Sequence, residues 1–217
     1  MRALSAEGVL SLRPTTVIAT TAAGPKEVLD QLRSTGVEIV VLPDLYDYDS
    51  VVLKIEEIGR LTGRSEAAAT LVAEGRSEMK RLADKLGTLP AKPRVLFLLS
   101  MGGGAPQAAG QTTAADGIIR LAGGTNAIQG YNGYRPLTPE AVIASRADFV
   151  LVTNQTIQAM GGVEAVRNQP ALSQTPAGKN NRILAFDALL LLGFGPRTPQ
   201  AAVELASALH PELAGKR

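Results

Sequence analysis

The chain has 217 residues, 45% of them hydrophobic, and its 22 basic residues nearly balance its 20 acidic ones. A chain of this length and composition can bury a sizeable core, so we expect one large or two small folded domains. The charges form no basic run and only 4% of residues are aromatic, which argues against nucleic acid as a partner. The absence of cysteine excludes disulfides, thiolate metal sites and a cysteine nucleophile.

No apolar run approaches the roughly 20 residues that cross a bilayer, so the sequence predicts a chain that does not span a membrane. The N-terminal stretch MRALSAEGVL lacks the pattern of a signal peptide. Composition and cysteine usage leave the compartment open.

Short apolar runs rich in β-branched residues alternate with longer amphipathic stretches, which is typical of an α/β fold. Five runs are predicted as strands: Thr16–Ala19, Glu38–Leu42, Arg94–Leu98, Phe149–Thr153 and Ile183–Phe186. Between the first two, one apolar helical face runs from Lys26 to Thr35, and Gly36 supplies a helix stop. This segment is therefore predicted to be a βαβ unit with parallel strands.

The following segment, residues 46–86, contains no strand candidate, and its apolar residues recur at helical spacing. They are Ile55, Ile58, Leu61, Ala68, Leu71, Ala73, Met79, Leu82 and Leu86. We predict two helices broken near Thr62–Gly63, with a domain boundary in the proline-containing stretch 87–93. The predicted division is an N-terminal lobe over 1–62, a connector helix and linker over 63–91, and a C-terminal lobe over 92–217.

An internal repeat links the two ends of the chain. LSAEGVLSLRPTTVIATT, at residues 4–21, aligns without a gap with LTPEAVIASRADFVLVTN, at residues 137–154. Each copy predicts an N-cap, a short helix and a strand, with a glutamate in the first helical turn, Glu7 or Glu140. A glutamate there can simply be a common first-turn residue. Its duplication instead suggests two matched carboxylates that dock onto a partner carrying basic residues.

The repeat, the connector helix and the two α/β lobes resemble the solute-binding proteins of iron, siderophore, haem and cobalamin importers. Three segments resemble the haem-binding members: AAGQTTAADGIIRLAGGTNAIQGYNGYRPLTPEAVIAS from Ala108, TPAGKN from Thr175 and LLGFGPRTPQA from Leu191. The resemblance covers essentially the whole chain. It implies two Rossmann-like lobes joined by a long connector helix, the class III periplasmic binding protein fold. Against that pattern we expect the N-terminal lobe to be incomplete and to expose a sheet edge and apolar surface.

The resemblance also implies a function. It implies a periplasmic monomer that binds haem as a transported ligand, uses no catalytic cofactor, and serves an ABC permease dimer with its ATPase. Glu7 and Glu140 are implied to engage arginines on the two permease subunits. Exposed ion pairs contribute little free energy, so these would set register and speed encounter. An iron-ligating tyrosine, whose phenolate suits ferric haem, is implied upstream of Met1.

Candidate ligand residues lie in GYNGYRP, just before the second glutamate helix. The repeat places Tyr134 and Arg135 at the positions of Met1 and Arg2. We predict that Tyr131 and Tyr134 contact the ligand from the C-terminal lobe. Arg2 and Arg135 are candidate partners for haem propionates, since a guanidinium binds carboxylates bidentately. A tyrosine in such a loop can equally be a packed anchor.

The glycine stretch SMGGGAPQAAG follows a predicted strand but lacks the spacing of a phosphate-binding loop. Met101, Gly102 and Gly103 are therefore predicted to line the ligand cleft between the two lobes, where glycine lets a flat ligand approach the backbone. The alternatives are a siderophore or cobalamin carrier or, from a different class, a cytosolic α/β enzyme using Gly102–Gly104 for a phosphorylated cofactor. The single histidine, His210, is predicted to lie at the surface without a metal role.

Overall fold

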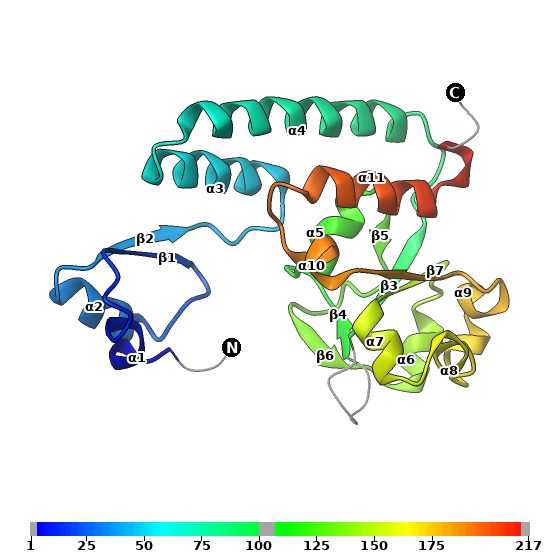
Figure 1. Cartoon of the computed structure of the whole chain (residues 1–217). Helices are drawn as coiled ribbons and strands as arrows, with labels where there is room; N and C mark the ends of the chain where they lie inside the picture. Colours follow the sequence, from blue (N-terminus) through cyan, green and yellow to red (C-terminus); the bar gives the residue numbers. More distant parts are fainter. Residues whose placement is uncertain (1–3, 100–106, 214–217) are drawn as a thin grey trace.

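The computed structural model describes residues 4–99 and 107–213, which form two separate sheets (Figure 1). The N-terminal sheet is a parallel pair, β1 (Thr16–Thr20) and β2 (Glu38–Leu42). The C-terminal sheet has the order β6 (Tyr134–Pro136), β4 (Gln107–Ala109), β3 (Arg94–Leu99), β7 (Phe149–Thr153) and β8 (Ile183–Phe186), with β5 (Thr125–Asn126) beside β3. The predicted α/β class and its five strands are confirmed, and the ends of two strands shift by one residue.

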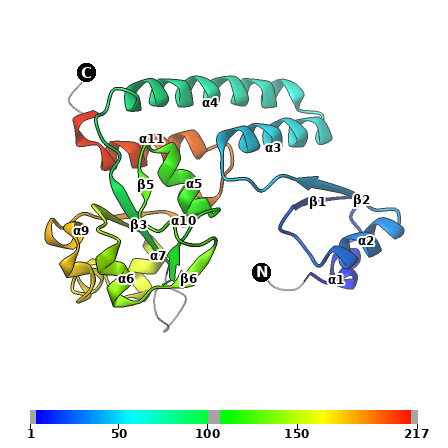
Figure 2. The ribbon, with the colours of Figure 1, turned by 180° about the vertical axis from the view of Figure 1, so that it is seen from behind.

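Helices cover the sheets and join them. They are α1 (Ala6–Leu10), α2 (Lys26–Ser34), α3 (Tyr48–Leu61), α4 (Ser65–Leu86), α5 (Ala114–Leu121), α6 (Pro139–Ala144), α7 (Asn154–Ala159), α8 (Val163–Arg167), α9 (Pro176–Lys179), α10 (Ala188–Leu192) and α11 (Thr198–Leu209), with 3-10 turns η1 (Leu172–Gln174) and η2 (Pro211–Leu213). Figures 1 and 2 show the two sheets at opposite ends, with α3 and α4 running along one side between them. Within the described ranges, no helix combines the length and hydrophobicity needed to cross a bilayer.

The two copies of the repeat have the same local geometry. Ser5 and Thr138 are the N-caps of α1 and α6, and each side chain accepts a 3.3 Å hydrogen bond from the backbone N–H three residues on. After each helix an arginine adopts a positive φ, 48° at Arg13 and 47° at Arg146, and a strand follows. The predicted order of cap, short helix and strand is therefore confirmed in both copies.

The N-terminal sheet is much more exposed than its repeat partner. No residue of β1 is buried, and Ile18 and Val41, on β1 and β2, are 47% and 40% exposed. All five residues of β7 are buried, because β7 lies between β3 and β8 whereas β1 pairs with β2 alone. The predicted exposure of a sheet edge and apolar surface in this lobe is confirmed.

The predicted pair of helices broken near Thr62–Gly63 is confirmed, since α3 ends at Leu61 and α4 begins at Ser65. We call α3 and α4 the connector helices, although the prediction gave that role to the second helix alone. The helices meet at Gly59, where an added methyl group would overlap the side chain of Ala68. Because the two helices approach closely here, Ala68 and Val72 of α4 face inward and are buried. Leu71 and Ala73, which belong to the predicted helical pattern, are both exposed, with Leu71 at 45%, because Val72 takes the inward position.

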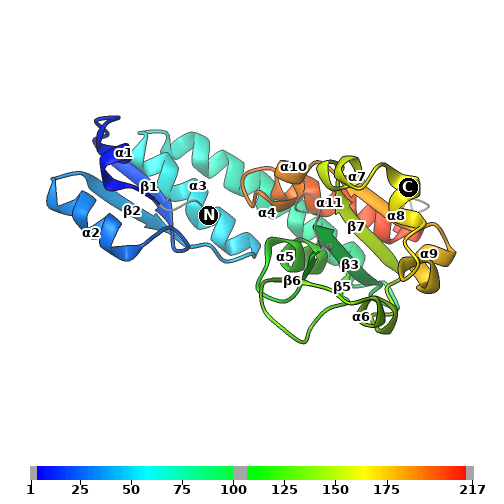
Figure 3. The same cartoon turned by 90° about the horizontal axis from the view of Figure 1, so that it is seen from below.

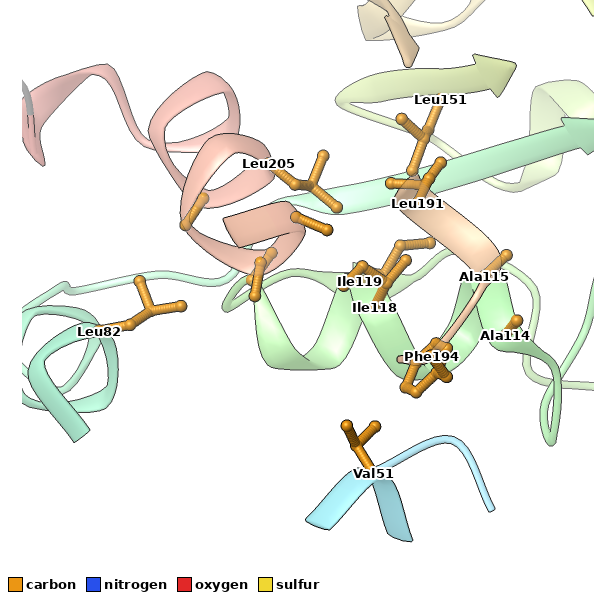
Figure 4. Close-up of a cluster of buried hydrophobic side chains, with 14 of the residues drawn as sticks. Val51, Leu82, Ala114, Ala115, Ile118, Ile119, Leu151, Leu191, Phe194 and Leu205 are labelled. Atoms are coloured by element: carbon orange, nitrogen blue, oxygen red, sulfur yellow. The ribbon is translucent and has the colours of Figure 1, made fainter. Parts of the chain in front are cut away.

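The C-terminal core lies on both faces of the larger sheet. Alternate residues of β3 face opposite sides: Val95 and Phe97 pack with α5, α10 and α11, whereas Leu96 and Leu98 pack toward α6 and η1. Figure 4 shows the first cluster, with Val51 of α3 at its margin. The connector helices therefore belong to the core of the C-terminal lobe. Seen from below in Figure 3, β1 and β2 lie away from that core.

Candidate functional site

The predicted ligand loop lies along the β6 edge of the C-terminal sheet. β4 pairs antiparallel with the end of β3, and β6 then pairs antiparallel with β4, placing Tyr134 opposite Ala109 and Arg135 opposite Ala108. The three-residue strands β4 and β6, which the sequence did not predict, thus place the tyrosines along the β6 edge of the sheet, with Tyr134 level with Phe97 in the middle of β3.

Tyr131 and Arg135 form a pair on the accessible side of this loop. The Arg135 guanidinium lies 4.9 Å from the centroid of the half-buried Tyr131 ring, at cation–π distance. The Tyr131 hydroxyl donates a 3.1 Å hydrogen bond to the carbonyl of Ala108. Burial raises the pKa of Tyr131, while Arg135 opposes the shift. Gly110 is required beneath the ring, since an added methyl group would overlap the Tyr131 backbone and ring.

Tyr134 has a different environment from Tyr131. Its ring packs edge-to-face on Phe97 in the core, with the centroids 6.4 Å apart. Burial, followed by the neighbouring Tyr46, raises its pKa, and interactions with the Ala115 backbone and the Thr113 side chain partly offset this. The structure therefore joins Tyr134 to a buried cluster that also holds Tyr46, from the linker before α3. No pattern in the sequence indicated that cluster.

A buried polar network supports the loop from below. The side-chain amide of Asn126, 2% exposed, donates to the carbonyls of Ala109 and Gly110 and to the carboxylate of Asp116, at 3.1, 3.1 and 3.2 Å. Its carbonyl accepts from the backbone N–H of Ile128 at 3.0 Å. All hydrogen-bonding atoms of Asn126 are thus used, and the network fixes the backbone next to the Tyr131 loop.

The two helices that carry the repeat glutamates lie on one side of the molecule. Figures 1 and 2 show α1 and α6 on the side facing away from α4. Glu7 and Glu140 are exposed, and neither forms an ion pair with a described residue. Hydrogen bonds from its own backbone N–H and from Thr138 lower the pKa of Glu140, so it is anionic at neutral pH. This geometry is compatible with two docking points.

A cavity of about 470 Å³ lies elsewhere, between the connector helices and the loop before α11. Its lining includes Phe194 and the ion pair of Lys54 with Asp44, whose charged atoms are 3.6 Å apart. None of the predicted ligand residues within the described ranges lines it. Four of the predicted ligand residues, Arg2, Met101, Gly102 and Gly103, lie outside the described residues.

The predicted surface position of His210 is wrong. Its side chain is 2% exposed at the end of α11, and its Nε2 atom has no hydrogen-bond partner among the described residues. Burial follows because His210 caps a helix that packs against the core, and Gly123 lies against its ring. No group of three or more potential metal ligands was found within the described ranges.

A sequence model described as periplasmic binding protein matches residues 2–189. The chain belongs to the periplasmic binding protein family. Two lobes linked by helices are the fold of its similar solved structures. One of these, titled "Periplasmic heme-binding protein BhuT in complex with two hemes (holo-2 form)", is 40% identical over 96% of this chain and 81% of that chain, with a TM-score of 0.87.

Other members of the family are similar over nearly the whole chain. The periplasmic heme-binding protein RhuT from Roseiflexus sp. RS-1 is 40% identical, covers 97% of this chain and 81% of its own, and has a TM-score of 0.87. A cobalamin-binding protein of Halobacterium salinarum is 30% identical over 94% of this chain and 55% of its own length. The chain spans 55% to 69% of the length of the curated relatives that it matches.

Proposed function

We propose that this chain binds haem between its two lobes and delivers it to an ABC-type import permease in the periplasm, as a monomeric carrier and not as an enzyme. The observation that carries this proposal is the 40% identity and TM-score of 0.87 with a heme-binding protein, over 96% of the chain. The proposed lobes are residues 1–62 and 92–217, joined by the helix and linker of residues 63–91.

The pair of Tyr131 and Arg135 supports this ligand class. Arg135 is exposed, and its guanidinium makes no ion pair with a described residue, so its donors are available to a propionate carboxylate. The ring of Tyr131 keeps the guanidinium in place on one face. We propose that this pair contacts the ligand from the C-terminal lobe. Tyr134, on the core side of the same loop, would act mainly by positioning the loop.

A hemin titration tests the proposal. We expect the Soret band of hemin to shift on addition of the purified chain, with weaker binding by Arg135→Ala and unchanged binding by Arg81→Ala, a matched arginine control on the exposed surface of α4. The same titration is run on the chain extended by any residues encoded upstream of Met1. An unshifted Soret band in both forms contradicts haem as the ligand.

A corrinoid is the second candidate ligand. It is favoured by the 30% identity, over 94% of this chain, with a cobalamin-binding protein of Halobacterium salinarum. Haem carries two propionates at one edge, whereas the corrin of cobalamin carries neutral amides. The exposed Arg135 therefore favours haem, since a cationic donor fork gains most from a carboxylate.

A further inference from the structure

An apolar recess of about 210 Å³ opens beside α6. Its floor is the core of the C-terminal lobe: Leu98, Val142 and Leu172 are 3%, 8% and 3% exposed. Leu137, which is partly exposed, forms part of its wall. Of the described residues that line the recess, Gln169 alone has a polar side chain. The recess therefore offers a nonpolar surface that a partner could bury.

The recess adjoins one of the two proposed docking carboxylates. Pro139 and Val142 line it, and both belong to α6, whose first turn carries Glu140. A cationic side chain that reaches the exposed Glu140 would bring its own neighbours over the recess. An apolar centre with charged residues at the rim is the common organisation of protein interfaces.

We propose that this recess seats an apolar side chain of the permease subunit whose basic residue contacts Glu140. The inference rests on the proposed docking function and deepens it. An exposed ion pair contributes little to affinity, so the apolar contact would supply binding strength while the carboxylate sets the register.

The contact is expected on one lobe only. Met160 and Leu172, in the wall and floor of the recess, come from the segment between β7 and β8, which contains α7, α8, η1 and α9. The matching segment between β1 and β2 holds α2 alone. The two glutamate helices therefore share caps and carboxylates but adjoin different surfaces, and the two permease subunits would be held unequally.

The test fills the recess and measures docking on the permease dimer with its ATPase in nanodiscs. Ala171→Phe places a ring in the recess, whereas Ala144→Phe adds the same bulk to the exposed surface of α6. We expect Ala171→Phe to raise the Kd for docking roughly 10- to 100-fold, the range set by burying one leucine-sized side chain. Ala144→Phe should change it by less than about threefold. Hemin binding and Tm should stay unchanged in both.

A second pair of variants covers the case in which Ala171→Phe does not fold. Leu137→Asn makes the wall polar, and Leu4→Asn is its counterpart in the repeat, on the lobe without the corresponding segment. The proposal requires Leu137→Asn to weaken docking more than Leu4→Asn does. Equal effects of the two, or wild-type docking by folded Ala171→Phe, overturn it.

Two further outcomes separate this inference from the function on which it rests. Loss of docking by Glu140→Arg together with wild-type docking by Ala171→Phe leaves the carrier function in place and overturns the recess. Self-association of the wild-type chain that Ala171→Phe abolishes, measured by sedimentation, places a second copy there and overturns it as well. Loss of docking by both variants supports it.

Discussion

The polar network beneath the ligand loop predicts that Asn126→Ala destabilises the chain and that the nearly isosteric Asn126→Asp destabilises it more. Asn126→Ala removes a hydrogen-bond partner of the Ile128 N–H and of the Ala109 carbonyl. The Gly110 carbonyl still accepts from the Thr113 hydroxyl, and the Asp116 carboxylate still pairs with Arg120. Each buried group left unsatisfied costs about 1–3 kcal/mol, so we expect a loss of about 2–6 kcal/mol. For a chain of this size that lowers Tm by roughly 5–20 °C.

Asn126→Asp should be more damaging than Asn126→Ala. It replaces the donating amide nitrogen with a carboxylate oxygen that faces two carbonyls and the carboxylate of Asp116. These acceptors then share no donor, and two like charges meet in a buried site. The control is Asn180→Asp: Asn180 also donates to a backbone carbonyl, at 2.9 Å, but is exposed. Thermal unfolding followed by circular dichroism measures all three. An Asn126→Asp variant as stable as the wild type would refute the reasoning.

Other substitutions and conditions test separate parts of the account. Glu7→Arg combined with Glu140→Arg should abolish transport and leave hemin affinity unchanged; reduced affinity would place these residues in the cleft. Phe194→Ala should lose about 3–5 kcal/mol of stability in denaturant unfolding, because the ring is 3% exposed and packs edge-to-face on Tyr46; a loss near zero would contradict this packing. His210→Leu should keep or raise Tm, since it removes a buried nitrogen without a partner in the described structure; a clear drop would reveal a role for that atom. The pKa of all four tyrosines is raised, chiefly by burial, so their phenolate absorbance should titrate at higher pH in the folded chain than in urea. The free energy of unfolding should then fall as pH rises from the tyrosine pKa of the unfolded chain through that of the folded chain. Equal titration curves in the folded chain and in urea would contradict the burial of the tyrosines.

Periodicity predicts the parts of this fold that bury long apolar faces. The strand Phe149–Thr153 and the connector helices were predictable because each presents a sustained pattern to the core. The strands β4, β5 and β6 have two or three residues each, which is too few to show an alternation of apolar and polar residues. In addition, β5 pairs with β3 and β6 pairs with β4, in both cases across the intervening helix α5.

The candidate site was predictable in location but not in the role of each residue. The repeat and the GYNGYRP motif led to Tyr131, Tyr134 and Arg135, and the structure places all three on adjacent strand positions or in the loop before them. Which tyrosine faces the core depends on the pairing of β6 with β4, and the sequence does not encode that register locally. The burial of His210 likewise depends on the docking of α11 against distant segments.

We propose that haem, and not a corrinoid, is the ligand of this chain. The decisive experiment is competition between hemin and cyanocobalamin for the purified chain, followed in the Soret region. We predict that hemin binds, that excess cobalamin does not displace it, and that Arg135→Ala weakens hemin alone. Displacement of hemin by cobalamin, or binding of cobalamin alone, would contradict the claim.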